Sequence, residues 1–256
     1  MTSHANLQKL RDFLGAEAAS RGLEWTLGVA SYREVYETLL PVQQRLLAEM
    51  SGEDFDGLMG SGSIISIAYA FPEEAIEAIA VETDEGYDME KWRTYAGEYE
   101  RLNSALDETA KGIAELFGGF ALAATLDVEG GIEKAVDYYP VAVSHRVAAE
   151  QSGVGWRGRN ELVVSPVHGS AVRLASVVTG LPLERTPPLE EDCGDCRACL
   201  DACSILAGKD GLENYRENCL RYMKSLGLER SVCGKCVKAC LGSPRIRSSS
   251  EAVGKP

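Results

Sequence analysis

All eight cysteines of this 256-residue chain lie between residues 193 and 240, at spacings typical of iron–sulfur ligands. The first run reads C-x2-C-x2-C-x3-C, the last reads C-x2-C-x3-C, and Cys219 stands between them. Two-residue gaps let one loop direct successive thiolates at one cubane, whereas the fourth cysteine of such a run ligates the other cluster in two-cluster ferredoxins. The pattern predicts two 4Fe–4S clusters with no cysteine left over. Tetrad I is Cys193, Cys196, Cys199 and Cys240, and tetrad II is Cys203, Cys219, Cys233 and Cys236.

Disulfides and zinc are the alternatives for these cysteines. The chain opens Met-Thr-Ser-His-Ala-Asn without an apolar signal region, so we expect a reducing, cytoplasmic compartment where disulfides are rare. Zinc favours paired C-x2-C knuckles, and a third cysteine two residues later gives one ligand too many per loop. The spacing therefore favours clusters over both alternatives.

Length and composition limit the kinds of protein that this chain can be. The length fits one large domain, or one domain with a small appendage, and no apolar segment approaches the length of a membrane span. The formal net charge of −13 argues against binding to a phosphate backbone. Basic residues gather among the cysteines, where they would either raise cluster potentials or form a solvated face. They are Arg216, Arg221, Lys224, Arg230, Lys235, Lys238, Arg245 and Arg247.

Hydrophobic periodicity predicts strands that alternate with helices, which is typical of an α/β layered fold. We expect helices over residues 5–21, 31–50, 92–117 and 141–151, and a short helix within 72–91, with Pro41 kinking or dividing the second of them. Strands are expected over 25–30, 63–70, 120–126, 162–164 and 172–178, with a loop over 51–62. Prolines at 182, 187 and 188 indicate a linker. The predicted organisation is an α/β domain (1–183), a cysteine-rich domain (184–247) and a disordered tail (248–256).

The segment from Gly153 to Gly158 matches G-x-G-x-x-G, the dinucleotide-binding fingerprint. That fingerprint requires a strand directly before it and a helix after it. Here a helix is predicted before the glycines and a strand after them. We therefore expect no nicotinamide or flavin site of the Rossmann type at this segment.

The same glycines belong to a resemblance with a known family. Gly153-Val-Gly-Trp-Arg-Gly-Arg-Asn160, Ser165-Pro-Val-His-Gly-Ser170 and Thr179-Gly-Leu-Pro-Leu183 resemble segments of the epoxyqueuosine reductases. That family carries G-x-G-W-x-G-K-N, a turn ending in Gly-Ser, and T-D-L-P-L before its double-cluster cysteines, and the placement of Cys219 also matches. The Ser165 turn and Arg173-Leu174 look equally like the related corrinoid reductive dehalogenases. The resemblance extends over about residues 140–245 and weakly upstream.

The resemblance implies a nitroreductase-like α/β domain that holds base-off cobalamin and a ferredoxin-like domain that supplies electrons from two 4Fe–4S clusters. Glycines would let the backbone approach a planar ligand closely, and polar side chains could bond corrin amides. A tightly turned connection without a ligand is the alternative, and flavin mononucleotide is the second choice of cofactor. The candidate cofactor-binding residues are Gly153, Gly155, Trp156, Gly158, Asn160, Ser165, His168 and Ser170.

One departure from the family concerns the proton donor. Epoxyqueuosine reductases carry an aspartate upstream of the glycine segment, and counting back at that spacing reaches Tyr139, with Asp137 displaced. A tyrosine donates the proton in the dehalogenases, so the candidate general acids are Tyr138, Tyr139 and His145. A tyrosine beside a proline also occurs in simple packing.

These observations give a set of functional hypotheses. The first is a reductase acting on a small molecule or on a corrinoid protein, with a redox partner protein as electron donor. The alternatives are a non-catalytic electron-transfer protein and a flavin-dependent reductase. The reductases continue into helical repeats that help bind tRNA, whereas this chain stops soon after Cys240, so we expect no nucleic-acid partner, and no membrane partner. Nitroreductase-like folds often dimerise, which leaves a homodimer open.

Overall fold

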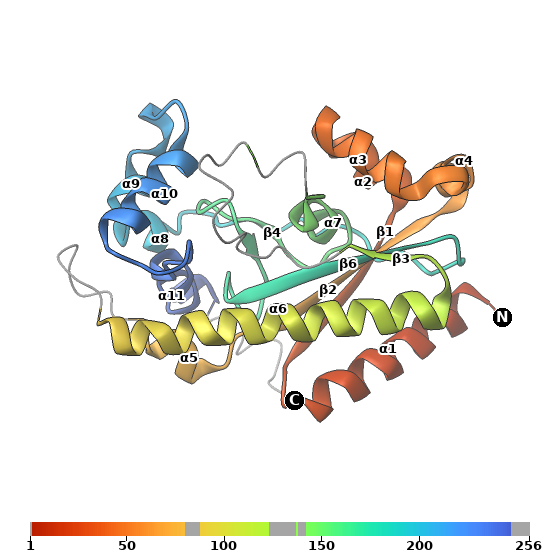
Figure 1. Cartoon of the computed structure of the whole chain (residues 1–256), viewed down its shortest axis with the longest axis horizontal. Coiled ribbons are helices and arrows are strands. Elements are labelled where there is room, and N and C mark those ends of the chain that lie inside the picture. Colours follow the sequence, from red (N-terminus) through yellow and green to blue (C-terminus); the bar gives the residue numbers. More distant parts are fainter. Residues whose placement is uncertain (1, 80–87, 123–136, 138–141, 247–256) are drawn as a thin grey trace.

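A four-stranded antiparallel sheet organises the protein (Figure 1). The computed structural model describes residues 2–79, 88–122, 137 and 142–246. The strand order is β1-β2-β6-β3. The strands are β1 (Trp25–Ser31), β2 (Ser63–Ala70), β3 (Phe120–Leu122) and β6 (Val172–Thr179). Every residue of β2 is buried, as its continuous apolar run predicts for a central strand. The mixed helix and sheet content confirms the predicted α/β class.

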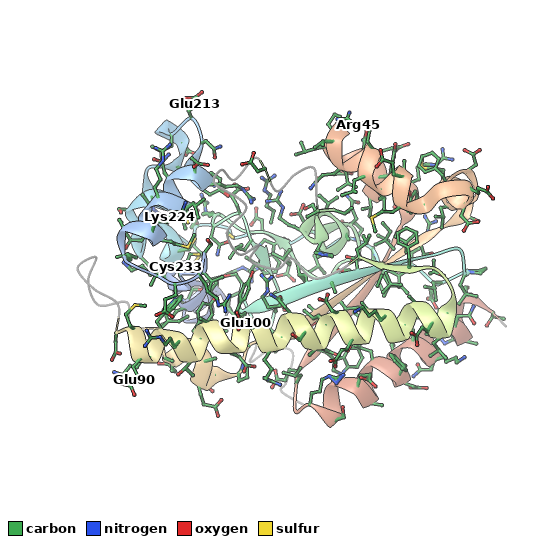
Figure 2. The ribbon with its side chains drawn as sticks, viewed as in Figure 1. Arg45, Glu90, Glu100, Glu213, Lys224 and Cys233 are labelled. Carbon is green, nitrogen blue, oxygen red and sulfur yellow. The ribbon has the colours of Figure 1, made fainter. Side chains whose placement is uncertain are left out.

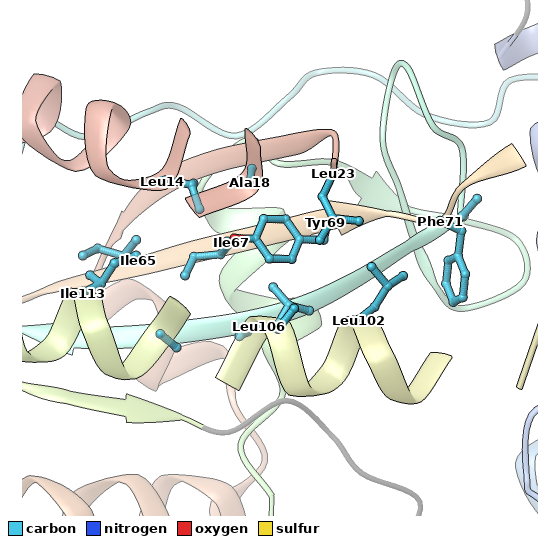
Figure 3. Packing of buried hydrophobic residues seen from close by; sticks show 14 of the residues in the cluster. Leu14, Ala18, Leu23, Ile65, Ile67, Tyr69, Phe71, Leu102, Leu106 and Ile113 are labelled. Atoms are coloured by element: carbon cyan, nitrogen blue, oxygen red, sulfur yellow. The ribbon is translucent and has the colours of Figure 1, made fainter. Parts of the chain in front are cut away.

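Helices α1 (Ser3–Ser20) and α6 (Met89–Phe117) cover one face of the sheet (Figure 1). Side chains from both helices meet β2 there in the main core, which includes Leu14, Ile67 and Leu106 (Figure 3). The Asp88 side chain caps α6 by accepting from the Lys91 amide at 3.2 Å. Such burial of apolar surface is the main favourable contribution to folding.

The opposite face of the sheet is covered by α7 (His145–Gln151), with α2 (Tyr32–Thr38) beside it. A Cβ atom at Gly28 of β1 would lie only 2.2 Å from the Ser152 carbonyl oxygen. Only glycine at this position therefore lets the end of α7 approach the sheet so closely.

Of the expectations for residues 31–62, one is confirmed and one is not. The helix expected over 31–50 is divided at Pro41, as predicted, because Pro41 begins a new helix, α3 (Pro41–Ser51), at a position where its missing amide hydrogen costs nothing. The loop expected over 51–62 was wrong, since η1 (Gly52–Asp54) and α4 (Phe55–Ser61) are helical. Low helix propensity suggested a loop, but Leu58, with partly buried Phe55 and Met59, packs into a second core and stabilises α4.

The cysteines lie in a group of short helices near the N-terminal end of α6 (Figure 1). Val232 and Val237 from this part join the main core beneath the sheet, together with Ile79, which follows α5 (Glu73–Glu77). The domain boundary at 183/184 stays a prediction. The helices are α8 (Ala198–Asp201), α9 (Ser204–Ala207), η3 (Lys209–Gly211), α10 (Tyr215–Ser225) and α11 (Lys235–Leu241). Across the described ranges, every helix is too short or too polar to cross a lipid bilayer.

Candidate metal centre

The predicted members of tetrad I are neighbours in the structure. Burial raises the pKa of Cys199 to about 11, and the thiols of Cys240, Cys193 and Cys196 add to the increase. Electrostatic influence of this kind declines with distance, so the three thiols lie near Cys199. All four cysteines are free thiols.

The members of tetrad II are likewise gathered together. Burial raises the pKa of Cys219 to about 11, with contributions from Cys233 and Cys203. Burial also raises the pKa of Cys236 well above its ordinary value, with the other three members of tetrad II and then Cys199 adding to it. The influence of Cys199 on Cys236 indicates that the two tetrads are adjacent.

One helix, α11, contributes to both tetrads, and two consecutive helices, α8 and α9, hold one member of each. On α11, Cys236 belongs to tetrad II and Cys240 to tetrad I, one helical turn apart. Cys199 on α8 and Cys203 at the start of α9 are divided in the same way. Within the described ranges, no three Cys, His, Asp or Glu side chains meet closely enough to share one metal ion. In a 4Fe–4S cluster each of the four irons takes one thiolate, so the four cysteines lie farther apart than the ligands of a single metal ion. The spacing of the cysteines within each tetrad fits such a cluster. Their role as ligands stays a prediction.

Tetrad I lies against the turn Ser165–Gly169 of the α/β part. Burial raises the pKa of Cys240, and hydrogen bonding from Ser170 partly opposes that increase. Gly169 has φ +54°, and a Cβ atom there would lie 3.3 Å from the Cys240 Sγ. The family-like segment that ends in Gly169-Ser170 therefore contacts the cysteines directly.

Tetrad II lies against the start of α6, where Cys233 is labelled in Figure 2. The Trp92 indole on α6 donates to the Val232 carbonyl at 2.9 Å. Gly234 has φ +81°, and a Cβ atom there would lie 2.5 Å from the Ile79 Cδ1. Burial, followed by the neighbouring Cys236, raises the pKa of Tyr95 on α6. The α/β part thus forms one wall of each tetrad.

The three candidate glycines face the chain itself. Their positions lie between α7 and a small hairpin of β4 (Trp156–Arg157) and β5 (Val163–Val164), so no strand precedes them as a Rossmann site requires. A Cβ at Gly153 (φ +71°) would lie 2.3 Å from the Pro187 oxygen, and one at Gly155 2.4 Å from the Val164 oxygen. At Gly158 it would lie 2.6 Å from the Asn160 Oδ1. These contacts are those of a tightly turned connection.

Most candidate polar residues also have partners within the chain. The Asn160 amide donates to the Ser170 Oγ at 3.0 Å. The Ser165 Oγ accepts from the amides of Val167 and His168 at 3.3 and 3.4 Å. The His168 Nδ1 lies 3.5 Å from the Glu24 carboxylate.

Trp156 differs from the other candidates. Its indole nitrogen is buried and has no hydrogen-bond partner within the part of the chain that the structure describes. The ring belongs to a cluster that also holds Cys193 and Cys240 of tetrad I. A buried donor without an acceptor is costly, so this atom is positioned for a bound group beside tetrad I.

Only one of the three candidate general acids can be placed. His145, at the start of α7, is buried with its Nδ1 3.0 Å from the Ser176 Oγ on β6. Tyr138 and Tyr139 lie outside the described residues. All three assignments stay predictions.

Sequence reasoning missed a charged network that joins the α/β part to the cysteine helices. Glu161, whose φ is +63°, pairs with Arg157 and with Lys209, the latter at 2.9 Å. The Arg146 guanidinium donates to the Glu161 carbonyl at 3.0 Å. Burial raises the pKa of Glu161, but hydrogen bonds from Lys209 and Arg157 outweigh it and lower the pKa overall. Arg157 is only four residues from Glu161, but no local spacing signals Lys209, which is 48 residues away.

The same junction contains a small hollow next to tetrad I. Its volume is about 280 Å³. Arg159 crosses it, with its guanidinium donating to the Gly194 carbonyl at 2.7 Å. The lining residues are Arg157, Gly158, Arg159, Glu161, Asp192, Cys193 and Gly194.

Known proteins with similar sequences include epoxyqueuosine reductases from several bacteria. The epoxyqueuosine reductase of Lactococcus garvieae (strain Lg2) is 31% identical over 184 residues, which are 71% of this chain and 46% of that protein. The epoxyqueuosine reductase of Bacillus subtilis (strain 168) is 43% identical over 81 residues, or 32% of this chain and 21% of that protein. The chain thus matches less than half the length of these relatives. No protein-family model matches it.

Solved structures support the same fold. A selenomethionine-labelled epoxyqueuosine reductase superposes with a TM-score of 0.51 at 19% identity, covering 94% of this chain and 67% of that one. A catabolic reductive dehalogenase in complex with 3-bromo-4-hydroxybenzoic acid gives a TM-score of 0.50 at 14% identity, covering 75% and 28%. At these identities the likeness concerns the fold alone.

One expectation must be corrected. A further structural neighbour is an epoxyqueuosine reductase with a tRNA-Tyr epoxyqueuosine-modified tRNA stem loop (24% identity, TM-score 0.45, covering 78% of this chain and 53% of that one). The exclusion of nucleic acid was therefore wrong. The physical error was to use net charge, because binding to phosphates depends on the local arrangement of charge rather than on its sum.

The cysteine pattern, the glycine segment and the relatives agree. The predicted resemblance is confirmed by homologues in sequence and by neighbours in fold that include a reductive dehalogenase. The chain is similar to the epoxyqueuosine reductases in sequence and fold, and to a reductive dehalogenase in fold, and these similarities support the predicted family.

Proposed function

We propose that this protein is a reductase in which two 4Fe–4S clusters deliver single electrons to an acceptor held by the α/β part. Tetrads I and II would hold the clusters, and the bound clusters would supply one-electron transfer. The acceptor would be a cofactor, with cobalamin as the first candidate, used to reduce a small molecule or a corrinoid protein.

The observation that carries this proposal is the grouping of eight free thiols into two adjacent sets of four. Helix α11 carries a member of each set, and each set contacts a different segment of the α/β part. Electron transfer benefits from such an arrangement, since adjacent carriers need no motion between them. A wall built from the α/β part also excludes water, and burial is one of the factors that set cluster potentials.

The fit of cobalamin to the described residues is incomplete. The space in front of Gly153, Gly155 and Gly158 is filled by the chain, so these glycines do not offer a corrin an open surface. The unsatisfied indole N–H of Trp156 supports a bound group nearby, with tetrad I as its neighbour. When bound, cobalamin would supply a reducible cobalt. Binding of cobalamin by the eight candidate residues stays a prediction.

The internally filled glycines favour a second candidate function. In a non-catalytic electron-transfer protein, the α/β part would be a docking platform and residues 153–160 a structural turn. Such a protein would be reduced reversibly and would hold no cofactor beyond its clusters.

Metal and cofactor analysis of the anaerobically purified protein tests both functions. Cobalamin and flavin mononucleotide should be offered during expression, followed by assays for iron, sulfide, cobalt and flavin. We expect about eight iron per chain, four for each cubane. Stoichiometric cobalt with a corrin absorption band would support the reductase.

Other results of the same analysis would favour a different function or contradict both proposals. The same iron content without cobalt or flavin would favour the electron-transfer protein. Bound flavin would identify a flavin-dependent reductase. Iron near zero after anaerobic reconstitution would contradict both cluster-based functions.

A further inference from the structure

Ser170 is a buried serine that lies against the sulfur atom of Cys240 in tetrad I. It is 2% exposed and directly follows Gly169, where a Cβ atom would lie 3.3 Å from the Cys240 Sγ. Burial raises the pKa of Cys240, and two hydrogen bonds from Ser170, one from its side chain and one from its backbone, oppose that increase. A donor has this effect on a thiol because it stabilises the thiolate. The hydroxyl and the backbone amide of Ser170 therefore both donate to the Cys240 sulfur.

Asn160 orients the Ser170 hydroxyl. Its side chain is buried, and its Oδ1 accepts from the Leu162 amide at 3.2 Å. The amide nitrogen of the same side chain donates to the Ser170 Oγ at 3.0 Å. A serine hydroxyl accepts through its lone pairs and has one hydrogen to donate. Because Asn160 occupies a lone pair, the hydrogen is left for Cys240, and a continuous series of hydrogen bonds leads from Leu162 to tetrad I.

A ligating thiolate is sensitive to such donors. Reduction adds one electron, and so one negative charge, to a cluster, and hydrogen bonds to its sulfur atoms are among the factors that set its potential. Donors to a sulfur stabilise the more negative, reduced form. The effect is stronger in a buried site, where the local dielectric is low. Groups that contact a ligand in this way also fix its orientation.

We propose that Ser170, oriented by Asn160, raises the reduction potential of the tetrad I cluster by donating its hydroxyl hydrogen to the Cys240 Sγ. The inference rests on the proposed function, because it requires a cluster in tetrad I. It gives Asn160 and Ser170 a role at the cluster in place of the corrin contacts that the resemblance implies. Reduction takes one electron from an external one-electron donor, and no bond of the hydrogen-bonded series breaks.

Potentiometric titration of the anaerobic full-length protein with dithionite, followed by electron paramagnetic resonance, tests the proposal. Iron content is measured in parallel, and the tetrad I signal is identified as the one retained in Cys219→Ala. In Ser170→Ala, which removes only the hydroxyl, we expect the tetrad I midpoint to shift to a more negative potential and the tetrad II midpoint to stay. The matched control is Ser165→Ala in the same turn, a buried hydroxyl that accepts from the amides of Val167 and His168, and it should leave both midpoints unchanged.

A spectroscopic measurement detects the hydrogen bond itself. After unfolding and anaerobic reconstitution in D2O, the hydroxyl of Ser170 carries a deuteron next to the cluster. Electron–nuclear double resonance of the reduced tetrad I cluster should then show a deuteron coupling that is lost in Ser170→Ala and retained in Ser165→Ala. A residue that only supports the turn would not give this difference. Wild-type protein without any deuteron coupling at tetrad I would overturn the inference.

A second variant covers failure of Ser170→Ala to assemble its cluster. Asn160→Ala retains the Ser170 hydroxyl and removes the donor that orients it, so the tetrad I midpoint should shift in the same direction by a smaller amount. An unchanged tetrad I midpoint in whichever of these variants retains both clusters would contradict the proposal. Equal shifts in Ser170→Ala and Ser165→Ala would do the same, since packing of the turn would then explain both. A wild-type protein without two clusters would instead overturn the proposed function.

Discussion

Gly155→Ala distinguishes a glycine that faces its own chain from a glycine that faces a ligand. The new Cβ would lie 2.4 Å from the Val164 carbonyl oxygen and 2.7 Å from the Val163 Cγ1. Contacts below 3.0 Å essentially never occur for real Cβ atoms, so β5 would have to move by roughly 0.6 Å. Backbone atoms cannot rotate away as a side chain can. The substitution therefore strains the hairpin that contacts tetrad I.

Overpacking of this kind costs about 1–3 kcal/mol. For a chain of this size each kcal/mol lowers the Tm by about 2–4 °C, so the expected decrease is about 2–12 °C. Thermal unfolding of the anaerobic protein, followed by circular dichroism, would measure it. The matched control is Gly57→Ala on α4, where a Cβ meets nothing within 4 Å. Alanine is favoured over glycine there by up to about 1 kcal/mol, so the control should be neutral or slightly stabilising.

Unchanged stability of Gly155→Ala together with loss of cobalamin or flavin uptake would refute this reasoning. It would mean that the space in front of Gly155 belongs to a ligand and that β5 moves aside to admit it. A lower Tm with unaltered cofactor content would support the tight turn.

Three further predictions concern the cluster ligands, the junction and the core. Cys219→Ala should reduce the iron content from about eight to about four per chain, because one cubane loses a ligand; an unchanged content would contradict the ligand assignment. Lys209 and Arg157 lower the pKa of Glu161 in the folded protein. The ionised Glu161 carboxylate therefore stabilises the folded state fully above the ordinary glutamate pKa, and this stabilisation is lost as pH falls through the lower folded pKa. The difference in urea midpoint between wild type and Glu161→Gln should accordingly shrink over that range, whereas a constant difference would exclude this origin. Leu106→Ala in the main core should cost about 2–5 kcal/mol by chemical denaturation, and Leu116→Ala, 42% exposed, should cost far less.

The sequence was sufficient where the signal is local. Cysteine spacing predicted two groups of four cysteines, because a two-residue gap restricts which thiolates one loop can direct at one cluster, and the structure brings these cysteines near one another. Their role as cluster ligands stays a prediction. The apolar run from Ser63 to Ala70 predicted a buried strand, because a strand that is buried on both faces needs apolar side chains at nearly every position. The helix over residues 55–61 was missed, because its glycines suggest a loop and only packing against the second core stabilises it.

Tertiary structure decided which surfaces meet. The sequence identified Gly155 and Gly158 as special, but not that Val163 and Val164 occupy the space in front of them, since that contact forms only when the hairpin closes. The charged network of Glu161 and Lys209 also depends on the fold, because its members are distant in sequence. The same holds for Lys235, which reads as one of many basic residues until α10 and α11 bury it against Tyr222. Spacing along a chain can predict a ligand set, whereas the burial of a charge depends on which elements fold over it.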